Sequence, residues 1–495
     1  MTDSCILSLL ILLPLLGGLL LLPLNGRPAL ARWLALTIVA LEFGLMLLVT
    51  LKTPAQGVGL LPGGYFLLED RPWIPHFGIR YLVGMDGISY LMALLTAFIT
   101  PLAVFTSWRS IKERVGFHFS LILFLEGAIM GIFLSLDLIL FYFFWEAMLI
   151  PMFLLIGIWG HGNRIHSALK FFIFTFSGSV LMLLGIIGVH LVHLAQSGKA
   201  TFAIPELIGT TFPPALEGWL FAAFLLAFSV KAPLVPFHTW LPDAHTDAPT
   251  AGSVDLAGLL LKTGAYGFIR IAWPLFPGAA AALTPLLLVV AVVGIIYGSW
   301  IAYAQTDLKR LVAYSSIGHM GFVMLGIAAW TPVSLTGSVL QMVNHGITTG
   351  ALFALVGMLG ERAGTREIAA FGGLWQRAPL LSGLFLFFAM ASAGVPGLNN
   401  FVGEFLILAG SFRAAHLMTV IAFIGVILPL IYTVRLSQRL LFVTPRSDFS
   451  MGDLSHRETV ILGSLALVDL YLGVHPIQFL ELLKGPVELL TGGAP

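Results

Sequence analysis

Long, uninterrupted runs of apolar residues follow one another along the 495-residue chain, separated by short segments rich in Gly, Pro and charged residues. A helix that spans a membrane needs about 20 apolar residues, whereas the strands of a membrane β-barrel alternate between polar and apolar positions. The pattern therefore predicts an all-α, polytopic membrane protein with about fourteen transmembrane helices. We expect these helices to begin near Cys5, Trp33, Leu82, Val115, Leu138, Ala168, Trp219, Gly252, Leu283, Leu311, Val333, Pro379, His416 and Thr459.

Two of these apolar runs are interrupted in a similar way. Residues 228–245 read FSVKAPLVPFHTWLPDAH and place Lys231 beside three prolines, and residues 389–406 read AMASAGVPGLNNFVGEFL and place Glu404 after a Val-Pro step. Proline breaks a helix because it removes a backbone donor and clashes with the preceding turn. Paired interrupted helices indicate an internal repeat with a pathway at the middle of the membrane.

Within a single transmembrane domain, residues 1–495, we expect one repeat over residues 115–275 and a second over residues 283–439. Five predicted spans separate the starts of the two repeats. Because an odd offset reverses the direction of crossing, the repeats are expected to be inverted relative to each other.

Composition agrees with a membrane protein and narrows its chemistry. The chain is 58% hydrophobic and only 10% charged, whereas soluble domains contain about 25% charged residues. Cys5 is the only cysteine, which excludes a disulfide within the chain and a thiolate cluster for iron–sulfur or structural zinc. The net charge of +1 does not point to nucleic acid. No Walker-type phosphate loop, H-E-x-x-H motif or G-x-S-x-G motif is present.

Charge between the predicted spans fixes an orientation. The segment that begins at Cys5 follows an acidic residue, Asp3, and is interpreted as the first span and not as a cleaved signal peptide. If this span starts outside, the inner segments contain sixteen Lys and Arg residues and the outer segments seven. Cytoplasmic loops are normally enriched in these residues. Both termini are therefore predicted on the outer side.

Several ionisable residues lie inside predicted spans, where a charge at a helix centre costs roughly 2.5–3.5 kcal/mol on insertion scales. Such residues must pair or face a water-filled interior, which makes them candidates for function. The candidate site residues are Glu146, Lys231, Asp255, Lys262, His319, His345 and Glu404.

The candidate residues have the chemistry of a proton relay. Glu146 and Lys231 have opposite charges and are predicted to pair, and a moving carboxylate changes how readily a lysine holds its proton. Asp255 and Lys262 are seven residues apart and are expected on one helix face. His319 and His345 can donate and accept protons at neutral pH.

Structural roles are the alternative for each of these residues. A buried histidine commonly makes only a structural hydrogen bond, and for Glu42 and Glu126 the structural interpretation is favoured. For His238 and His245, near the predicted inner mouth, a solvated loop position competes with a functional role. Two lysines in the middle of spans have no ordinary packing role, which favours function for Lys231 and Lys262.

Six sequence motifs together resemble one known family. The motifs are YFFWEAMLIPMFLL, FSVKAPLVPFHTWLPDAH, APTAGSVDLAGLLLKTGAYG, AQTDLKRLVAYSSIGHMGFV, NHGITTGALF and VPGLNNFVGEFLIL. They resemble the antiporter-like, proton-pumping membrane subunits of respiratory complex I, over about residues 73–432. Glutamate at Glu404, where the sister subunits usually have lysine, together with GSVDLAGLLLK, favours the M type over the L and N types.

The resemblance implies fourteen helices and two inverted five-helix repeats, each with a broken helix. It implies that Glu146 and Lys231 form the family's Glu–Lys pair and that Lys262 is the central lysine. It further implies that His319 and His345 are the connecting histidines and that Glu404 faces the outer exit.

The resemblance also implies partners and a location. No cofactor is expected in this chain, because NADH, FMN, the iron–sulfur clusters and quinone belong to partner subunits. The expected neighbours are L-type and N-type membrane subunits on either side and, through the complex, a peripheral redox arm; the chain is expected to be multi-pass in a bacterial inner membrane. The alternatives are a subunit of a multisubunit cation/proton antiporter or of a membrane-bound hydrogenase, a polytopic membrane enzyme such as a lipid-modifying transferase, and a structural spacer.

Overall fold

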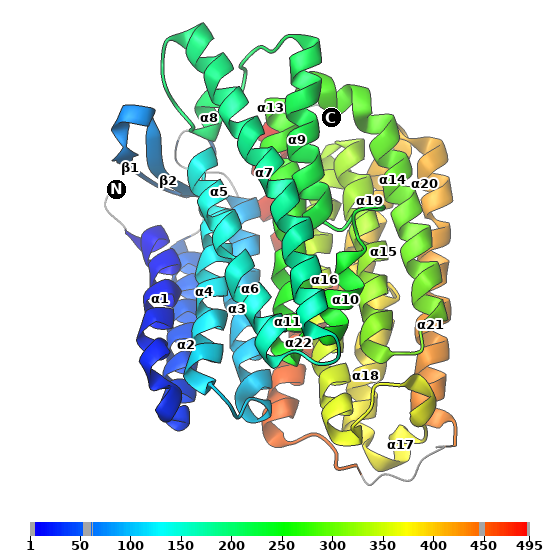
Figure 1. Cartoon of the computed structure of the whole chain (residues 1–495). Helices are drawn as coiled ribbons and strands as arrows, with labels where there is room; N and C mark the ends of the chain where they lie inside the picture. The colour runs from blue at the N-terminus through cyan, green and yellow to red at the C-terminus, as the bar shows by residue number, and fades with distance from the viewer. Residues whose placement is uncertain (1–4, 53–60, 62, 445–450, 493–495) are drawn as a thin grey trace.

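The computed structural model describes residues 5–52, 61, 63–444 and 451–492. Most helices run along a common direction, with α1 (Ile6–Leu21) and α2 (Pro28–Lys52) at one edge and α14 (Pro277–Ala304) at the opposite edge (Figure 1). Within the described residues, eleven helices are long and apolar enough to cross a membrane, or twelve if one bent pair counts as a span. The predicted all-α, polytopic membrane class is confirmed, and the number fourteen stays a prediction.

The remaining helices follow the order of the predicted apolar runs. The first half of the chain contains α3 (Gly87–Ser110), α4 (Val115–Leu134), α5 (Leu138–Ala147), α6 (Leu149–Trp159), α7 (Arg164–Ser197), α8 (Ile204–Leu207), α9 (Pro214–Lys231) and α10 (Trp240–Asp247). Next come α11 (Thr250–Asp255), α12 (Leu261–Gly267) and α13 (Trp273–Leu275). The second half contains α15 (Leu308–Ala329), α16 (Pro332–Ala363), α17 (Leu374–Arg377), α18 (Pro379–Ser392), α19 (Asn399–Ala414), α20 (His416–Ala422), α21 (Ile424–Ser437), α22 (His456–Val474) and α23 (Ile477–Thr491).

A β-hairpin covers one end of the bundle. Strand β1 (Leu67–Ile74) pairs antiparallel with β2 (Ile79–Met85), whereas the polar residues of the segment from about Lys52 to Arg80 predict a loop. The third long helix therefore begins at Gly87 and not near Leu82, which lies in β2. The prediction was wrong because an apolar strand and the apolar start of a helix have the same local signal.

Both described ends of the chain meet this hairpin end of the bundle. The Leu7 amide at the start of α1 donates to Glu69 of β1, with an N–O distance of 2.8 Å. In α23, Leu482 lies so close to Gly87 that a side chain on that glycine would overlap the Leu482 carbonyl. A chain that starts and ends on the same side crosses an even number of times, which agrees with the parity of the predicted count.

Polar caps mark where several long helices begin. Asp86 and Thr331 cap α3 and α16 in capping boxes with Ser89 and Ser334, and Asp137 caps α5 by accepting from the amides of Ile139 and Leu140. Burial raises the pKa of Asp137, although these amides and the neighbouring Arg80 oppose the shift. Such caps satisfy orphan amides at a helix start, which matters most where water is scarce.

Two helices are broken where the sequence predicted interruptions. The segment 232–239 separates α9 from α10, and the segment 393–398 separates α18 from α19. In the second break, Gly394 and Gly397 adopt φ values of +71° and +93°, a region that L-residues with side chains rarely enter. The proposed boundaries of the inverted repeats stay a prediction.

A third interruption was not expected. The helical stretch from α11 to α13 contains two π-helical turns, Leu256–Leu260 and Phe268–Ala272. A π turn has more residues per turn than an α-helix, so it rotates the residues that follow relative to those that precede it. This rotation decides which side of the helix Lys262 faces.

Candidate functional site

Lys262 on α12 is fully buried and contacts a histidine from another helix. Its Nζ lies 2.7 Å from Nδ1 of His345 on α16, and it also donates to the carbonyl oxygen of Ala257. Lysine ammonium is only a donor, so a charged Lys262 requires His345 Nδ1 to accept and places the imidazole hydrogen on Nε2. That Nε2 has no hydrogen-bond partner among the described residues.

Small residues allow the helices around Lys262 to approach closely. An added Cβ at Gly346 would lie 2.9 Å from the carbonyl oxygen of Gly258, in the first π turn. An added Cβ at Gly264 would lie 2.7 Å from the backbone nitrogen of Ala232, which directly follows Lys231. Two glycine contacts therefore pack the Lys262 helix against α16 on one side and against the end of α9 on the other.

A second group of hydrogen bonds surrounds Glu404 on α19. One Glu404 oxygen lies 3.0 Å from Nδ1 of His319 on α15 and 3.1 Å from the Nε2 donor of Gln341 on α16. The other ring nitrogen of His319 lies 3.2 Å from the hydroxyl of Ser392, the last residue of α18. Three helices and the second break thus converge on one carboxylate.

These two groups join into one chain of ionisable side chains. The ring centroids of His319 and His345 are 5.5 Å apart, and every member is almost completely buried. We name the sequence Lys262, His345, His319 and Glu404 the midplane row. The structure therefore brings together four of the seven residues that the sequence singled out.

Lys231 and Glu146 are not joined in an ion pair. Lys231 is the last residue of α9 and is 1% exposed, and its Nζ has no hydrogen-bond partner among the described residues. The ammonium instead lies over the rings of Trp145 and Phe171, 5.3 and 5.6 Å from their centroids. Glu146, on α5, is half-buried, with one carboxylate oxygen lacking a partner. Glu146 follows Trp145 in the sequence, and the Trp145 ring contacts the Lys231 ammonium, but the two charged groups form no ion pair with each other.

Asp255 and Lys262 lie on either side of a π turn. Asp255 is buried on α11, and both its carboxylate oxygens lack a hydrogen-bond partner in the described part of the chain. The expectation of one shared helix face assumed an uninterrupted α-helix, whereas the π turn Leu256–Leu260 lies between the two residues.

The histidines near the first break are less exposed than a solvated loop position would be. His245 on α10 is fully buried and stacks on Phe353, with a centroid distance of 4.4 Å. His238 is also buried and meets Tyr297 edge-on. Both are packed residues in this structure.

Two buried charged residues were not among the predicted site residues. Lys309 is one of the sixteen Lys and Arg residues assigned to the inner segments, yet it is buried in the first turn of α15 and donates to the Ala248 carbonyl at 2.7 Å and to Ser253 at 3.1 Å. Asp469 on α22 is fully buried, accepts from Thr348 at 2.8 Å, and lies 3.4 Å from the amide of Asn399 at the start of α19. The available signal was an acidic residue in the apolar run after His456.

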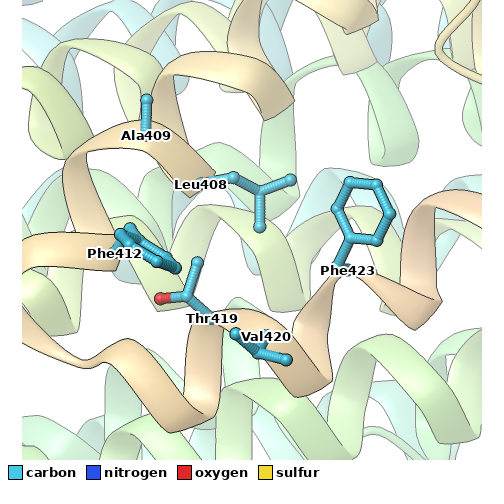
Figure 2. Close-up of a pocket in the computed structure, with 6 residues that line it drawn as sticks. All are labelled: Leu408, Ala409, Phe412, Thr419, Val420 and Phe423. Atoms are coloured by element: carbon cyan, nitrogen blue, oxygen red, sulfur yellow. The ribbon is translucent and has the colours of Figure 1, made fainter.

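The described residues contain no grouped set of metal ligands, and one surface cavity between α19 and α20 is lined mainly by apolar side chains. No cluster of three or more His, Cys, Asp or Glu residues there could hold a metal ion. Figure 2 shows a surface cavity of about 420 Å³, whose only side-chain oxygen belongs to Thr419. It is lined by Leu408, Ala409, Phe412, Thr419, Val420 and Phe423, and its lining includes no residue of the midplane row.

Known proteins resemble this chain over nearly its full length. The family model described as NADH:quinone oxidoreductase/Mrp antiporter, TM, matches residues 135–429. The NADH-quinone oxidoreductase subunit M of Pseudomonas aeruginosa is 45% identical over 490 residues, which is 96% of each chain.

Two solved structures have the same fold. A chain of respiratory complex I from Thermus thermophilus is 34% identical, with a TM-score of 0.88 over 98% of this chain and 99% of that one. A chain of the Mrp complex from Dietzia sp. DQ12-45-1b has a TM-score of 0.87 at 20% identity, over 99% and 97% of the two chains.

Proposed function

We propose a function for this chain from the premise that it belongs to the NADH:quinone oxidoreductase/Mrp antiporter family of membrane subunits. We infer that it is the M-type membrane subunit of an NADH-quinone oxidoreductase, respiratory complex I, and that it moves protons across the membrane. The relatives at 45% and 42% identity bear the name subunit M, which supports this subunit over its sister types.

The observation that carries this function is the midplane row. It joins a lysine, two histidines and a glutamate from α12, α16, α15 and α19 inside an otherwise apolar bundle. Buried ionisable groups inside a membrane protein are costly and mark ion pathways and proton relays. The packing of apolar side chains alone does not require four ionisable residues to lie next to one another.

The hydrogen bonds give the row a direction for proton transfer. When Lys262 is charged, His345 accepts at Nδ1 and carries its hydrogen on Nε2. When Glu404 is ionised, neutral His319 donates from Nδ1 and accepts from Ser392 at Nε2. The two histidines thus hold opposite tautomers, and a proton that enters each ring at one nitrogen leaves from the other.

Glu146 and Lys231 supply the control step in this proposal. A charge change in a neighbouring subunit alters the separation of these two groups, and Lys231 then passes its proton toward Lys262. The open arrangement supports this step, because Lys231 is held by the rings of Trp145 and Phe171 and not by a closed ion pair. Protons finally leave from Glu404 toward the outer side.

The redox chemistry is assigned to partner chains. NADH, FMN, the iron–sulfur clusters and quinone are proposed to lie in other subunits, and this chain acts as the translocating part of the enzyme without redox catalysis of its own. L-type and N-type subunits are the proposed neighbours. The proposed location is a bacterial inner membrane with both termini on the periplasmic side.

Proton pumping in membrane vesicles tests this assignment. Lys231→Ala and Lys262→Ala are each expected to reduce NADH-driven proton pumping at least tenfold, because each removes a proton-carrying group. Lys484→Ala is the matched control, since Lys484 is an exposed lysine on α23, and its pumping should equal that of the unaltered complex. Unchanged pumping in Lys231→Ala, with the complex intact, would contradict the proposed function.

The partners decide between this function and a cation/proton antiporter. Likeness to the Mrp complex chain is at 20% identity and shows the fold alone. Mass spectrometry of the solubilised assembly should find NADH-oxidising and quinone-binding chains. Recovery of only antiporter chains would instead support the alternative.

A further inference from the structure

A buried carboxyl group on α22 lies against the second break. Asp469 is fully buried and takes part in none of the ion pairs formed by the described residues. Gly473 follows four residues later on the same face of α22, and an added Cβ there would overlap the carbonyl oxygen of Gly397. Helix α22 therefore packs directly on the segment after which α19, the helix of Glu404, begins.

Thr348 on α16 lies between Asp469 and Asn399, the first residue of α19. Its Oγ1 is 2.8 Å from Oδ2 of Asp469 and 3.0 Å from Oδ1 of Asn399. The other oxygen of Asp469, Oδ1, lies 3.4 Å from the backbone nitrogen of Asn399. Nδ2 of Asn399 donates to the Asn344 carbonyl at 3.2 Å, which fixes Oδ1 as the atom that faces Thr348. We call Asp469, Thr348 and Asn399 the polar tether.

An ionised Asp469 would leave the polar tether one hydrogen short. A hydroxyl group has a single hydrogen to donate, whereas a carboxylate and an amide oxygen only accept. Thr348 would then have two acceptors, Asp469 and Asn399, and one of these buried oxygens would lose its hydrogen bond. The carboxylate would also be a buried charge without a counter-ion.

One added proton satisfies every contact of the tether. With this proton on Oδ2, Asp469 donates to Thr348, and Thr348 donates to Oδ1 of Asn399. Oδ1 of Asp469 remains free to accept from the Asn399 amide, one of the helix-start amides that have no partner within α19. The carboxyl group is then neutral and needs no counter-ion.

We propose that Asp469 is a positioning residue of the midplane row, which binds one proton and through Thr348 holds the start of α19 in place. The proposal rests on the proposed function for its purpose, because the positioned group is Glu404, five residues after Asn399 on α19. Release of the proton breaks the O–H bond of Asp469 and transfers the proton to water. Thr348 then turns its hydrogen to the carboxylate, the contact with Asn399 is lost, and Glu404 is held less firmly.

Other titratable residues occur on the helices around Asp469. Helices α3, α16, α18 and α19 pack against α22, and α18 has no titratable residue. The titratable residues of the others, with those of α22 itself, are Tyr90, Arg109, His345, Glu361, Arg362, Glu404, Arg413, His456, Arg457, Glu458 and Tyr471. The described contacts of the Asp469 carboxyl group are to Thr348 and Asn399, so its proton depends chiefly on the polar tether.

Infrared spectra of the assembled complex test for the proton on Asp469. A protonated carboxyl group has a carbonyl band that a carboxylate and an amide lack. The spectrum of the unaltered complex minus that of Asp469→Asn should therefore contain this band at neutral pH and lose it as the pH is raised. Absence of the band at every pH at which the complex is intact would overturn the proposal.

Thr348→Val tests the contact that holds the proton. Valine has the shape of threonine without the hydroxyl, so the O–H group of Asp469 loses its acceptor and its carbonyl band should move to higher frequency. The matched control is Thr349→Val, because Thr349 is the next residue on α16, is 1% exposed and has no hydrogen-bond partner among the described residues. An unmoved band in Thr348→Val, or an equal shift in both variants, would contradict the contact.

Proton pumping divided by electron-transfer rate tests the positioning role. Asparagine at position 469 keeps a donor and an acceptor in a neutral side chain, whereas leucine has neither. The ratio in Asp469→Leu should therefore be at least threefold below that in Asp469→Asn, and equal ratios would overturn the role. If Asp469→Leu does not assemble, Thr348→Val takes its place and should lie at least threefold below Thr349→Val.

The pH dependence separates a proton-linked tether from a merely structural one. As the pH rises, the unaltered complex should lose pumping per electron over the same range in which it loses the infrared band, because deprotonation frees the start of α19. Asp469→Asn has no such proton, so this step should be absent. The same decline in both would show that Asp469 does not link a proton to pumping.

The infrared spectra need no enzyme turnover, so the two proposals can fail separately. A missing band, with pumping still sensitive to Lys231→Ala, would remove only the proton on Asp469. A normal band, with pumping insensitive to Lys231→Ala, would remove the proposed pathway and leave Asp469 as a proton-binding group.

Discussion

At the level of single residues, the second break is shaped around Glu404. Gly394 adopts φ +71°, and an added Cβ there would lie 3.1 Å from a Glu404 oxygen. That carboxylate already accepts hydrogen bonds from His319 and Gln341. In this break, Gly394 therefore places backbone without a side chain next to Glu404, the last residue of the midplane row.

Gly394→Ala is expected to reduce proton pumping by roughly fivefold or more. Left-handed backbone costs a residue with a side chain about 1–2 kcal/mol, and the new methyl group crowds Glu404. An effect of that size changes a conformational equilibrium by about 5–30-fold. NADH-driven pumping in vesicles, divided by electron-transfer rate, measures it.

Gly383→Ala is the control for this substitution. Gly383 lies on the preceding helix, α18, and an added Cβ there would meet nothing within 4 Å. Pumping in this variant should be normal. Equal pumping in both variants would show that the close approach of Gly394 to Glu404 is unimportant.

At the level of elements, sequence patterns identified the breaks but not the π turns. Prolines and glycines beside Lys231 and before Glu404 predict interrupted helices, and the structure has both breaks. The π turn Leu256–Leu260 has no proline or unusual spacing to reveal it, since its residues LAGLL suit an α-helix equally well. Spacing arguments across it, such as the shared face of Asp255 and Lys262, assume an uninterrupted α-helix that the chain does not have there.

The same limit applies to pairs of side chains on different helices. Opposite charges suggested contact between Glu146 and Lys231, but the sequence has no information on the Trp145 and Phe171 rings that hold the ammonium. The sequence and the resemblance place the members in the order Lys262, His319, His345 and Glu404, whereas tertiary packing places His345 beside Lys262 and His319 beside Glu404. Asp469 was missed because a lone acidic residue in a late span has no distinguishing spacing.

Gly264→Ala should separate the Lys262 helix from the end of α9. The new Cβ would lie 2.7 and 2.8 Å from backbone atoms of Ala232 and Phe228, which cannot rotate away as a side chain could. Overpacking of this kind costs about 1–3 kcal/mol. We expect a lower thermal midpoint for dissociation of the complex, measured on detergent-solubilised samples, together with weaker pumping.

Gly252→Ala is the matched change on the same interrupted helix. Its added Cβ would make ordinary contacts of 3.4 Å with the Pro249 ring. This variant should keep the thermal midpoint and the pumping rate. If both alanine variants behaved alike, close backbone packing at Gly264 would not be what positions Lys262.

At the level of the whole molecule, hydropathy predicted the class of fold because the membrane imposes it. Every backbone polar group at membrane depth must be paired internally, which leaves long apolar helices as the solution for this composition. Exact boundaries depended on features that hydropathy does not report, such as the hairpin before Gly87. Structure adds the fact that α1 begins and α23 packs at the same hairpin end.

The side of the membrane on which that hairpin end lies can be tested with the single cysteine of the chain. Cys5 is exposed, and its sulfur lies 3.0 Å from an Arg71 nitrogen in β1. The excess of Lys and Arg in the opposite segments predicts that this end is periplasmic. A membrane-impermeant maleimide should therefore label Cys5 in right-side-out vesicles and fail to label it in inverted vesicles, as read by mass spectrometry of this chain.

A Cys5→Ser variant with an exposed cysteine introduced at Ser110, at the far end of α3, should give the reverse pattern. Labelling of Cys5 only in inverted vesicles would show that the hairpin end is cytoplasmic. The proposed direction of proton release from the midplane row would then be wrong as well.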